Sequence, residues 1–164
     1  MRTLLVTGPG GAGSSTLALD EETVATHPAL QDYAGRDVIV GIRPEDLEDA
    51  ALASDAPTDR RLRGSVSLRE SLGSEIMVHI EIDAGAAMTE DVRELAEDTD
   101  AIAVQQATKE KPYTTMIGRF GPRSRIHEGD VAEVVVDTRS LHFFDPESGL
   151  GIYDGENQQK GATA

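Results

Sequence analysis

Cysteine and tryptophan are absent from this chain of 164 residues, and aromatic residues make up only 4% of it. The absence of cysteine excludes disulfide bonds and thiolate metal sites, and it fits a reducing compartment. With only three Phe and three Tyr, the core has to be built from Val, Ile, Leu and Ala. We therefore expect one domain of ordinary size whose core lies largely in strands.

Basic charge and long apolar runs are also scarce. Fifteen Lys and Arg stand against thirty Asp and Glu, which gives a formal net charge of −15. Such a surface repels phosphodiester backbones and anionic lipid, so nucleic acid is not expected as a partner. No apolar stretch approaches the about 20 residues of a membrane span, and the start "MRTLLVT" is too short for a secretory signal. These absences predict a cytoplasmic protein.

The clearest strand pattern lies at residues 63–83, where apolar and polar residues alternate as in a hairpin with one wet face. Val66 and Leu68 are expected on one face of the first strand, and a turn at Gly73 leads to the second. On the second strand, the pattern places Ile76, Val78, Ile80 and Ile82 on the inner face and Glu75, His79, Glu81 and Asp83 on the outer face.

Short strands and few helices are expected elsewhere. Asp20 is expected to cap a short helix, Pro28 to open another that Gly35 closes, and residues 88–107 to form a longer helix. Residues 47–61 are expected to form a surface loop with one helical turn. The remaining strands are expected at 3–7, 15–19, 37–42, 113–120, 131–137 and 141–144. This pattern predicts a mainly β fold with one or two helices, an OB-like small antiparallel barrel with an inserted helix.

The glycine-rich stretch "GPGGAGSST" at residues 8–16 imitates a phosphate loop, G-x-x-x-x-G-K-[ST]. Gly8 and Gly13 have the required spacing, and Ser15 occupies the position of the hydroxyl that holds magnesium. Ser14 stands where the phosphate-binding lysine belongs, so the cation is missing in a chain that is already acidic. The interpretation as a glycine-rich turn is favoured, and nucleotide binding by these four residues remains the alternative.

Catalytic and metal-binding patterns are not found in the sequence. The four histidines, at 27, 79, 127 and 142, lack the spacing of metal ligands. No G-x-S-x-G nucleophile motif occurs, and carboxylates are too many for a catalytic pair to be picked out. We therefore expect neither catalytic residues nor a metal site in this chain.

Two resemblances to known families follow from the quoted residues. The start "MRTLLVTGPGGAG", residues 1–13, weakly resembles the beginning of anion-pump (ArsA-like) ATPases. Three other stretches resemble ABC-transporter ATP-binding subunits of the sugar and glycerol-3-phosphate importer class, in the region just beyond the motor domain. These stretches are "YAGRDVIVGIRPEDLEDA", "LRESLGSEIMVHIEI" and "DTRSLHFFDPESGLGIY", and they occur in the family's order.

The second resemblance implies an OB-like (TOBE) regulatory domain at residues 14–153, after a leader at 1–13 and before a disordered tail at 154–164. It implies a non-catalytic accessory domain, isolated or truncated from its motor domain, with no cofactor of its own, whereas the complete family protein uses ATP and magnesium. The implied partners are an ABC motor domain or second ATPase subunit, a second copy as a dimer, and indirectly membrane permease subunits. The implied location is the cytoplasm, peripheral to the inner face of the cell membrane.

The resemblance also implies residues for contact with these partners. One stretch is the turn in "GIRPE", for which a local ion pair between Arg43 and Glu45 is the alternative interpretation. The other is the turn "LGSE", which no basic residue accompanies in the sequence, so turn chemistry is the alternative there. A divergent phosphate-loop ATP-binding protein and an OB module that senses a small ligand remain open as other functions. The contact residues are Arg43, Pro44, Glu45, Gly73, Ser74 and Glu75.

Overall fold

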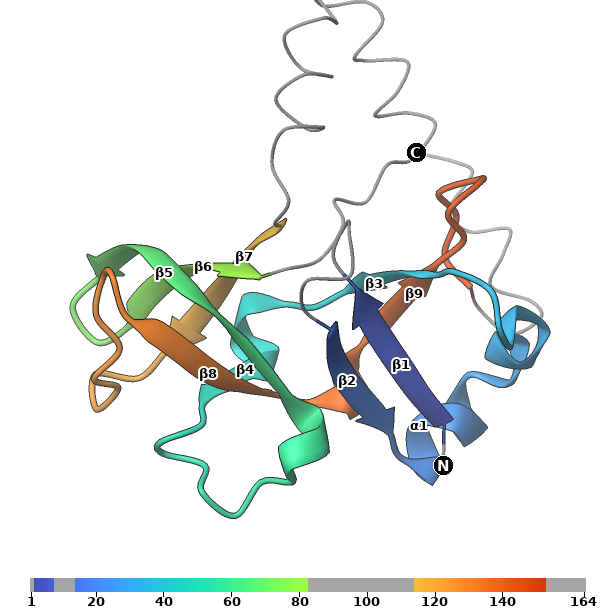
Figure 1. Ribbon diagram of the computed structural model, residues 1–164, viewed down its shortest axis with the longest axis horizontal. Helices are drawn as coiled ribbons and strands as arrows, with labels where there is room; N and C mark the ends of the chain where they lie inside the picture. Colours follow the sequence, from blue (N-terminus) through green and yellow to red (C-terminus); the bar gives the residue numbers. More distant parts are fainter. Residues whose placement is uncertain (1, 8–13, 83–113, 153–164) are drawn as a thin grey trace, which may run out of the picture.

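The computed structural model describes residues 2–7, 14–82 and 114–152. Within them the chain is mainly β, as the sequence predicted, and the strands form three antiparallel sheets (Figure 1). Two sheets are two-stranded and pair β1 (Arg2–Thr7) with β2 (Ser14–Leu19), and β3 (Ile39–Gly41) with β9 (His142–Phe144). The third is five-stranded, in the order β4 (Leu47–Asp49), β8 (Val131–Val136), β5 (Arg61–Ser71), β6 (Ile76–Ile82) and β7 (Thr114–Phe120).

The five-stranded sheet curls until its two edge strands lie side by side. A Cβ atom added to Gly118 of β7 would lie 3.4 Å from Cδ1 of Leu47 on β4, although these strands are not paired by hydrogen bonds. The side chains that point into the curl are fully buried, among them Val78, Ile80 and Val134, each 0% exposed. The sheet therefore forms a small half-closed antiparallel barrel, which confirms the predicted fold class.

The hairpin predicted at residues 63–83 is present as β5 and β6. All four apolar residues expected on the inner face of β6 are buried, and Gly73 in the turn has φ +79°, a conformation that glycine adopts without strain. The prediction for Leu68 was wrong, because its side chain is 40% exposed. The register shifts between Val66 and Leu68, so one extra residue reverses the alternation and turns Leu68 outward.

The two short helices near the N-terminus begin where the sequence predicted. Asp20 caps helix α1 (Glu21–Thr26), since its Oδ1 accepts a hydrogen bond of 2.8 Å from the amide of Thr23. A 3₁₀ helix, η1 (Pro28–Tyr33), then starts at Pro28, and Gly35 follows it with φ +76°. Both short helices were therefore predicted correctly.

The prediction of a surface loop at residues 47–61 was wrong for its first three residues. Leu47–Asp49 forms strand β4, which pairs with β8, and a 3₁₀ turn, η3 (Thr58–Arg60), ends the segment. Another turn, η2 (Pro44–Asp46), leads into β4. Three residues are too few for an alternating pattern to be recognised, and the pairing strand lies far away in the sequence.

The strands predicted at 3–7, 15–19, 113–120, 131–137 and 141–144 are present, and β3 lies within the predicted 37–42. The helix expected at 88–107 and the tail at 154–164 lie outside the described residues. The domain boundary after residue 13 stays a prediction, and β1 pairs with β2 across it from Arg2–Leu19 to Thr7–Ser14.

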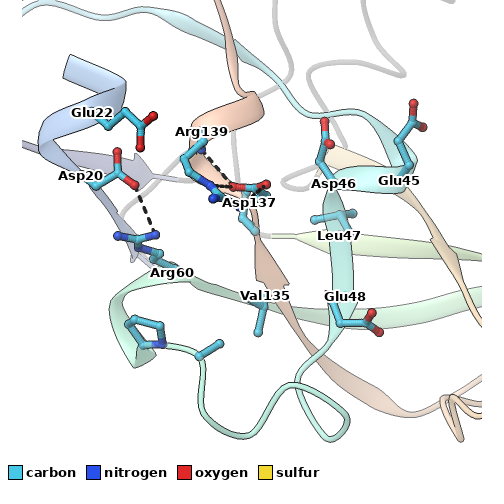
Figure 2. A pocket seen from close by; sticks show the side chains of 13 residues that line it. Asp20, Glu22, Glu45, Asp46, Leu47, Glu48, Arg60, Val135, Asp137 and Arg139 are labelled. Atoms are coloured by element: carbon cyan, nitrogen blue, oxygen red, sulfur yellow. Dashed lines mark hydrogen bonds and ion pairs between the residues drawn. The ribbon is translucent and has the colours of Figure 1, made fainter. Parts of the chain in front are cut away.

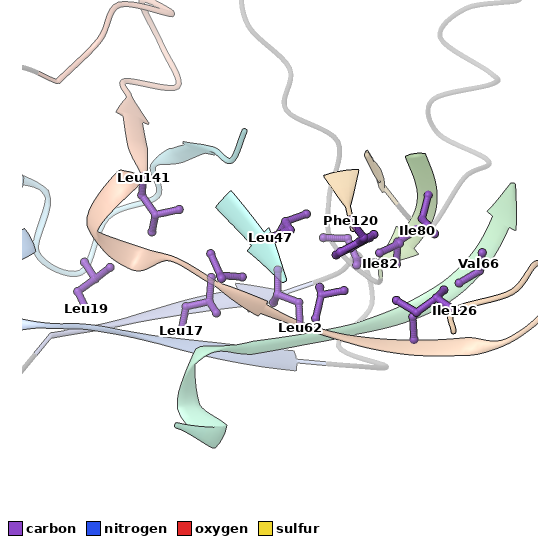
Figure 3. Packing of buried hydrophobic residues seen from close by; sticks show 14 of the residues in the cluster. Leu17, Leu19, Leu47, Leu62, Val66, Ile80, Ile82, Phe120, Ile126 and Leu141 are labelled. Atoms are coloured by element: carbon purple, nitrogen blue, oxygen red, sulfur yellow. The ribbon is translucent and has the colours of Figure 1, made fainter. Parts of the chain in front are cut away.

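The buried apolar side chains form one cluster that runs through the molecule. Figure 3 shows it extending from Leu19 and Leu141, past Leu17 and Leu62, to Phe120 and Val66 inside the barrel. The core is therefore shared between the barrel and the segments around β2 and η4 (Thr138–Ser140).

Asp145 connects the turn that follows β9 to the N-terminal segment through hydrogen bonds. Its carboxylate accepts hydrogen bonds from the amide of Ser148 at 2.7 Å and from the hydroxyl of Tyr33 at 2.7 Å. Arg36 lies over the ring of Tyr33, 4.9 Å from its centroid. The Ser148 amide, followed by the hydroxyls of Tyr33 and Ser148, lowers the pKa of Asp145 to about 2.

We predict that Asp145 stabilises the fold only while it is ionised. Its pKa is about 2 in the folded protein against an ordinary value of 3.8, so its contribution is complete above about pH 4 and is lost as the pH falls through 2. Asp145→Asn should lower the melting temperature at neutral pH, and its difference from the parent should vanish near pH 2. Glu147→Gln, which removes an exposed carboxylate nearby, serves as the control. A difference independent of pH would contradict this assignment.

We also predict that Gly64→Ala destabilises the fold. A Cβ atom there would lie 2.4 Å from the carbonyl oxygen of Glu81 and 2.7 Å from Cγ2 of Ile80, so backbone has to move. The free energy of unfolding should fall by about 1–3 kcal/mol, measured by urea titration. Gly121→Ala is the matched control, since its Cβ meets nothing within 4 Å. Equal stability of the two variants would show that the close approach of β5 to β6 does not restrict position 64 to glycine.

Candidate functional site

An acidic cleft of about 480 Å³ opens where η2 and β4 face α1, η3 and η4. Figure 2 shows Asp20, Glu22, Arg60, Asp137 and Arg139 on one side of it. The opposite side is formed by η2 and β4, and the apolar lining comes from Leu47, Ala56, Pro57 and β8. The six carboxylates that line the acidic cleft are those of Asp20, Glu22, Glu45, Asp46, Glu48 and Asp137.

Two arginines pair with two of these carboxylates. Arg139 binds Asp137 through two hydrogen bonds, Nε to Oδ1 at 2.9 Å and Nη2 to Oδ2 at 3.0 Å. Arg60 Nη1 lies 3.5 Å from Oδ2 of Asp20. The hydrogen bond from Arg139 holds the pKa of Asp137 below its usual value, and the hydroxyl and amide of Thr23 do the same for Asp20. Both pairs fix the local turns, because Asp20 and Asp137 also cap α1 and η4.

The other four carboxylates form no ion pair within 4.0 Å among the described residues, although the charge of Glu22 acts on Arg139. Glu48 accepts a hydrogen bond only from the amide of Asp49, at 2.9 Å. Oδ2 of Asp46 is buried and has no hydrogen-bond partner within the described part of the chain. With two arginines against six carboxylates, the acidic cleft favours positively charged groups and repels oxyanions.

The predicted contact residues Arg43, Pro44 and Glu45 form the start of η2 at the rim of this cleft. The carbonyl of Arg43 accepts the amide of Asp46 at 3.0 Å, which closes the turn. Arg43 and Glu45 are exposed, and Arg43 forms no ion pair with any described residue. Glu45 lines the cleft. The structure therefore places one predicted contact residue beside acidic residues that the sequence analysis did not identify.

The second predicted stretch, Gly73, Ser74 and Glu75, lies elsewhere, in the exposed turn between β5 and β6. The amide of Leu72 donates to the carbonyl of Glu75 at 2.8 Å across this turn. The structure does bring a basic residue to this turn, since Nη1 of Arg119 lies 3.7 Å from Oε1 of Glu75. Arg119 comes from β7, which pairs with β6, so only the sheet brings them together.

Ser14 and Ser15, two of the residues considered for nucleotide binding, lie in strand β2. This strand pairs antiparallel with β1, the strand before the glycine-rich stretch. In a phosphate loop the chain instead continues into a helix, whose first amides bind the phosphate. Gly8 and Gly13 lie outside the described residues, so nucleotide binding there stays a prediction.

The curled antiparallel sheet defines a small β-barrel module of the OB class. Two family models match this chain: the MalK OB fold domain at residues 7–47 and the TOBE domain at residues 40–108. The chain therefore belongs to the C-terminal OB/TOBE region of sugar-importer ABC ATPases. None of the described helices is long and apolar enough to cross a membrane.

Three curated proteins are similar in sequence to most of this chain. The trehalose/maltose import ATP-binding protein MalK of Thermococcus litoralis is 33% identical over 122 residues, 74% of this chain and 25% of that protein. The oligosaccharides import ATP-binding protein MsmX of Bacillus subtilis is 30% identical over 73% of this chain and 25% of its own length. The trehalose import ATP-binding protein SugC of Mycobacterium tuberculosis is 31% identical over 85% and 33%. The chain thus spans a quarter to a third of these relatives.

We predict that Ser14→Lys leaves ATP binding unchanged. The added lysine would sit in a strand hairpin, where no helix N-terminus follows to complete a phosphate site. Calorimetric titration with magnesium-ATP checks this, and Ser71→Lys, in β5, controls for the added charge. A gain of about 1.5–3 kcal/mol in the binding free energy of Ser14→Lys alone would instead establish a phosphate cradle.

Proposed function

We propose that this chain is a non-catalytic regulatory module of an ABC-type sugar or glycerol-3-phosphate import ATPase, and that it acts by contact with the ATPase motor domain. The observation that supports this proposal most is the match of residues 7–108 to the MalK OB fold and TOBE domains. The names of the three relatives, all import ATP-binding proteins, support the same class of transporter. ATP and magnesium would be bound by the motor domain, and this chain needs no cofactor of its own.

The rim of the acidic cleft is the surface we assign to the motor-domain contact. Arg43, which precedes η2, and Glu45 within it are exposed, and the turn is held by the hydrogen bond from the amide of Asp46 to the carbonyl of Arg43. Glu45 is one of the four cleft carboxylates that form no ion pair within 4.0 Å among the described residues. A basic surface on the motor domain would complement this charge, which favours encounter and orientation. The same charge makes an oxyanion-sensing role the poorer alternative.

The further partners follow from the same proposal. A second ATPase subunit or a second copy of this chain would lie beside the module, and the permease subunits would be reached through the motor domain. The module would then work in the cytoplasm, held at the inner face of the cell membrane by the transporter complex. Signals would pass through contacts between rigid elements rather than through bound nucleotide.

We predict that Glu45→Lys weakens binding to the separately produced motor domain of the same transporter by about tenfold or more, because it places a positive charge against a basic surface. Titration calorimetry at physiological ionic strength measures the change. Glu128→Lys is the matched control, since Glu128 is exposed in the loop between β7 and β8 and does not line the cleft.

Two results would contradict the proposed contact with the motor domain. One is the absence of any binding between the parent chain and the motor domain. The other is an equal loss of affinity in Glu45→Lys and Glu128→Lys, which would show that total charge, and not this rim, governs the contact. Turnover of ATP by the purified chain alone would overturn the non-catalytic assignment.

A further inference from the structure

We propose that Asp49 and Ser124 are positioning residues for the motor-domain contact, because the buried hydrogen bond between them fixes the register of β4 and with it the acidic side of the cleft. This inference rests on the proposed function, in which the rim of the cleft contacts the motor domain. Oγ of Ser124 donates to Oδ2 of Asp49 at 2.7 Å, although the two residues are 75 positions apart in the sequence.

The hydrogen bond crosses the seam of the half-closed barrel, which is the line where the edge strands β4 and β7 lie side by side without pairing. Asp49 is the last residue of β4, and Ser124 lies in the loop between β7 and β8. Packing also closes the seam, since a Cβ atom on Gly118 would lie 3.4 Å from Cδ1 of Leu47. The hydrogen bond therefore links two edges of the described sheet that its backbone hydrogen bonds leave unconnected.

Both partners are buried, and the carboxylate is satisfied by hydrogen bonds alone. Asp49 is 4% exposed and Ser124 is 5% exposed, and Asp49 forms no ion pair with a described residue. Oδ1 of Asp49 accepts the amide of Ala51 at 2.9 Å, and Oγ of Ser124 accepts the amide of Ile126 at 3.4 Å. Loss of the Ser124 hydroxyl would leave Oδ2 of Asp49 buried without a donor among the described residues, which is unfavourable.

A buried carboxylate contributes specificity more than stability. A well-packed apolar pair at the same place would usually stabilise a core at least as well, because no charge would have to leave water. A polar pair differs from an apolar pair in that it is satisfied in one alignment only. The best-attested use of such buried polar groups is to fix the register of neighbouring elements.

Strand β4 is so short that its register needs this kind of support. It pairs with β8 over three residues only. Leu47 and Asp49 are buried, whereas Glu48 between them is exposed. A shift of one residue would turn Glu48 into the barrel and Leu47 outward. The observed register brings Asp49 to Ser124, so the hydrogen bond between them selects this register.

The register of β4 also determines which acids line the cleft. Leu47 and Glu48 line it from β4, and Glu45 and Asp46 line it from η2, which directly precedes β4. Figure 2 shows these four residues following one another along η2 and β4. The amide of Asp137 donates to the carbonyl of Asp46 at 2.9 Å, so the pairing with β8 continues into η2. A shift of β4 would therefore remove Glu48 from the cleft and displace Glu45 on its rim.

Hydrogen exchange, followed by nuclear magnetic resonance, tests the register without any partner protein. The amides of Ala50 and Asp137 extend the pairing of β4 with β8 at its two ends. Ser124→Ala should raise their exchange rates by about tenfold or more relative to that of Val78 in β6. Ser54→Ala is the matched control, because it removes an exposed hydroxyl from the loop after β4. Equal exchange rates in the two variants would overturn the proposal.

Titration calorimetry with the motor domain tests the positioning role. Ser124→Ala should weaken binding by about five- to tenfold, although it changes no charge and Ser124 does not line the cleft. Because this variant already displaces Glu45, Glu45→Lys should lower the affinity by a smaller factor in its background than in the parent. A purely structural role would lower only the folded fraction, which thermal unfolding measures, and would leave the two factors independent.

Asp49→Asn is the conservative variant, since its side-chain amide can donate to Oγ of Ser124 and keep the two residues joined. It should bind the motor domain within about twofold of the parent. A loss as large as that of Ser124→Ala would assign the effect to the charge of Asp49 and overturn the role of the hydrogen bond.

The two measurements distinguish failure of this inference from failure of the proposed function. A parent chain that does not bind the motor domain would overturn the proposed function and the positioning role with it, while hydrogen exchange would still report on the register of β4. A parent chain that binds, and that Glu45→Lys weakens, supports the proposed function. Parent-like binding by Ser124→Ala, or independent factors in the double variant, would then overturn the positioning role alone.

Discussion

The fold depends on the close approach of β5 to β6 at Gly64. The first half of β5 pairs with β8 and the second half with β6, and both pairings meet at Ser65. The backbones approach so closely there that a Cβ atom on Gly64 would stand 2.4 Å from the carbonyl oxygen of Glu81. Only glycine permits this approach, and the irregularity after Val66 completes the change of direction. The sheet can therefore curl enough to bring β4 beside β7.

The acidic cleft is a consequence of that curl. It needs β4 and η2 on one side, α1 and η4 on the other, and β8 as the common support. The hydrogen bonds of Asp20 and Asp137 to their own turns fix one wall, while the acids on η2 and β4 stay without cationic partners in the described chain. A surface of this kind favours positively charged groups over phosphate, as the proposed contact with a motor domain requires.

The same curl gives β5, β6 and β7 an inner and an outer face with different roles. The inner face is the barrel core, whereas the outer face combines exposed apolar side chains with one positive and several negative groups.

The sequence alone determined what depends on neighbouring residues: the β5–β6 hairpin with its positive φ at Gly73, the cap at Asp20, and the start of η1 at Pro28. Its resemblance to importer ATPases was also sufficient to identify the family. The tertiary structure decided what depends on pairing across the chain. It turned Leu68 outward, made a strand of Leu47–Asp49, and placed Arg119 beside Glu75. The physical reason is that strand register and sheet curvature are set by partners distant in sequence, which no local pattern contains.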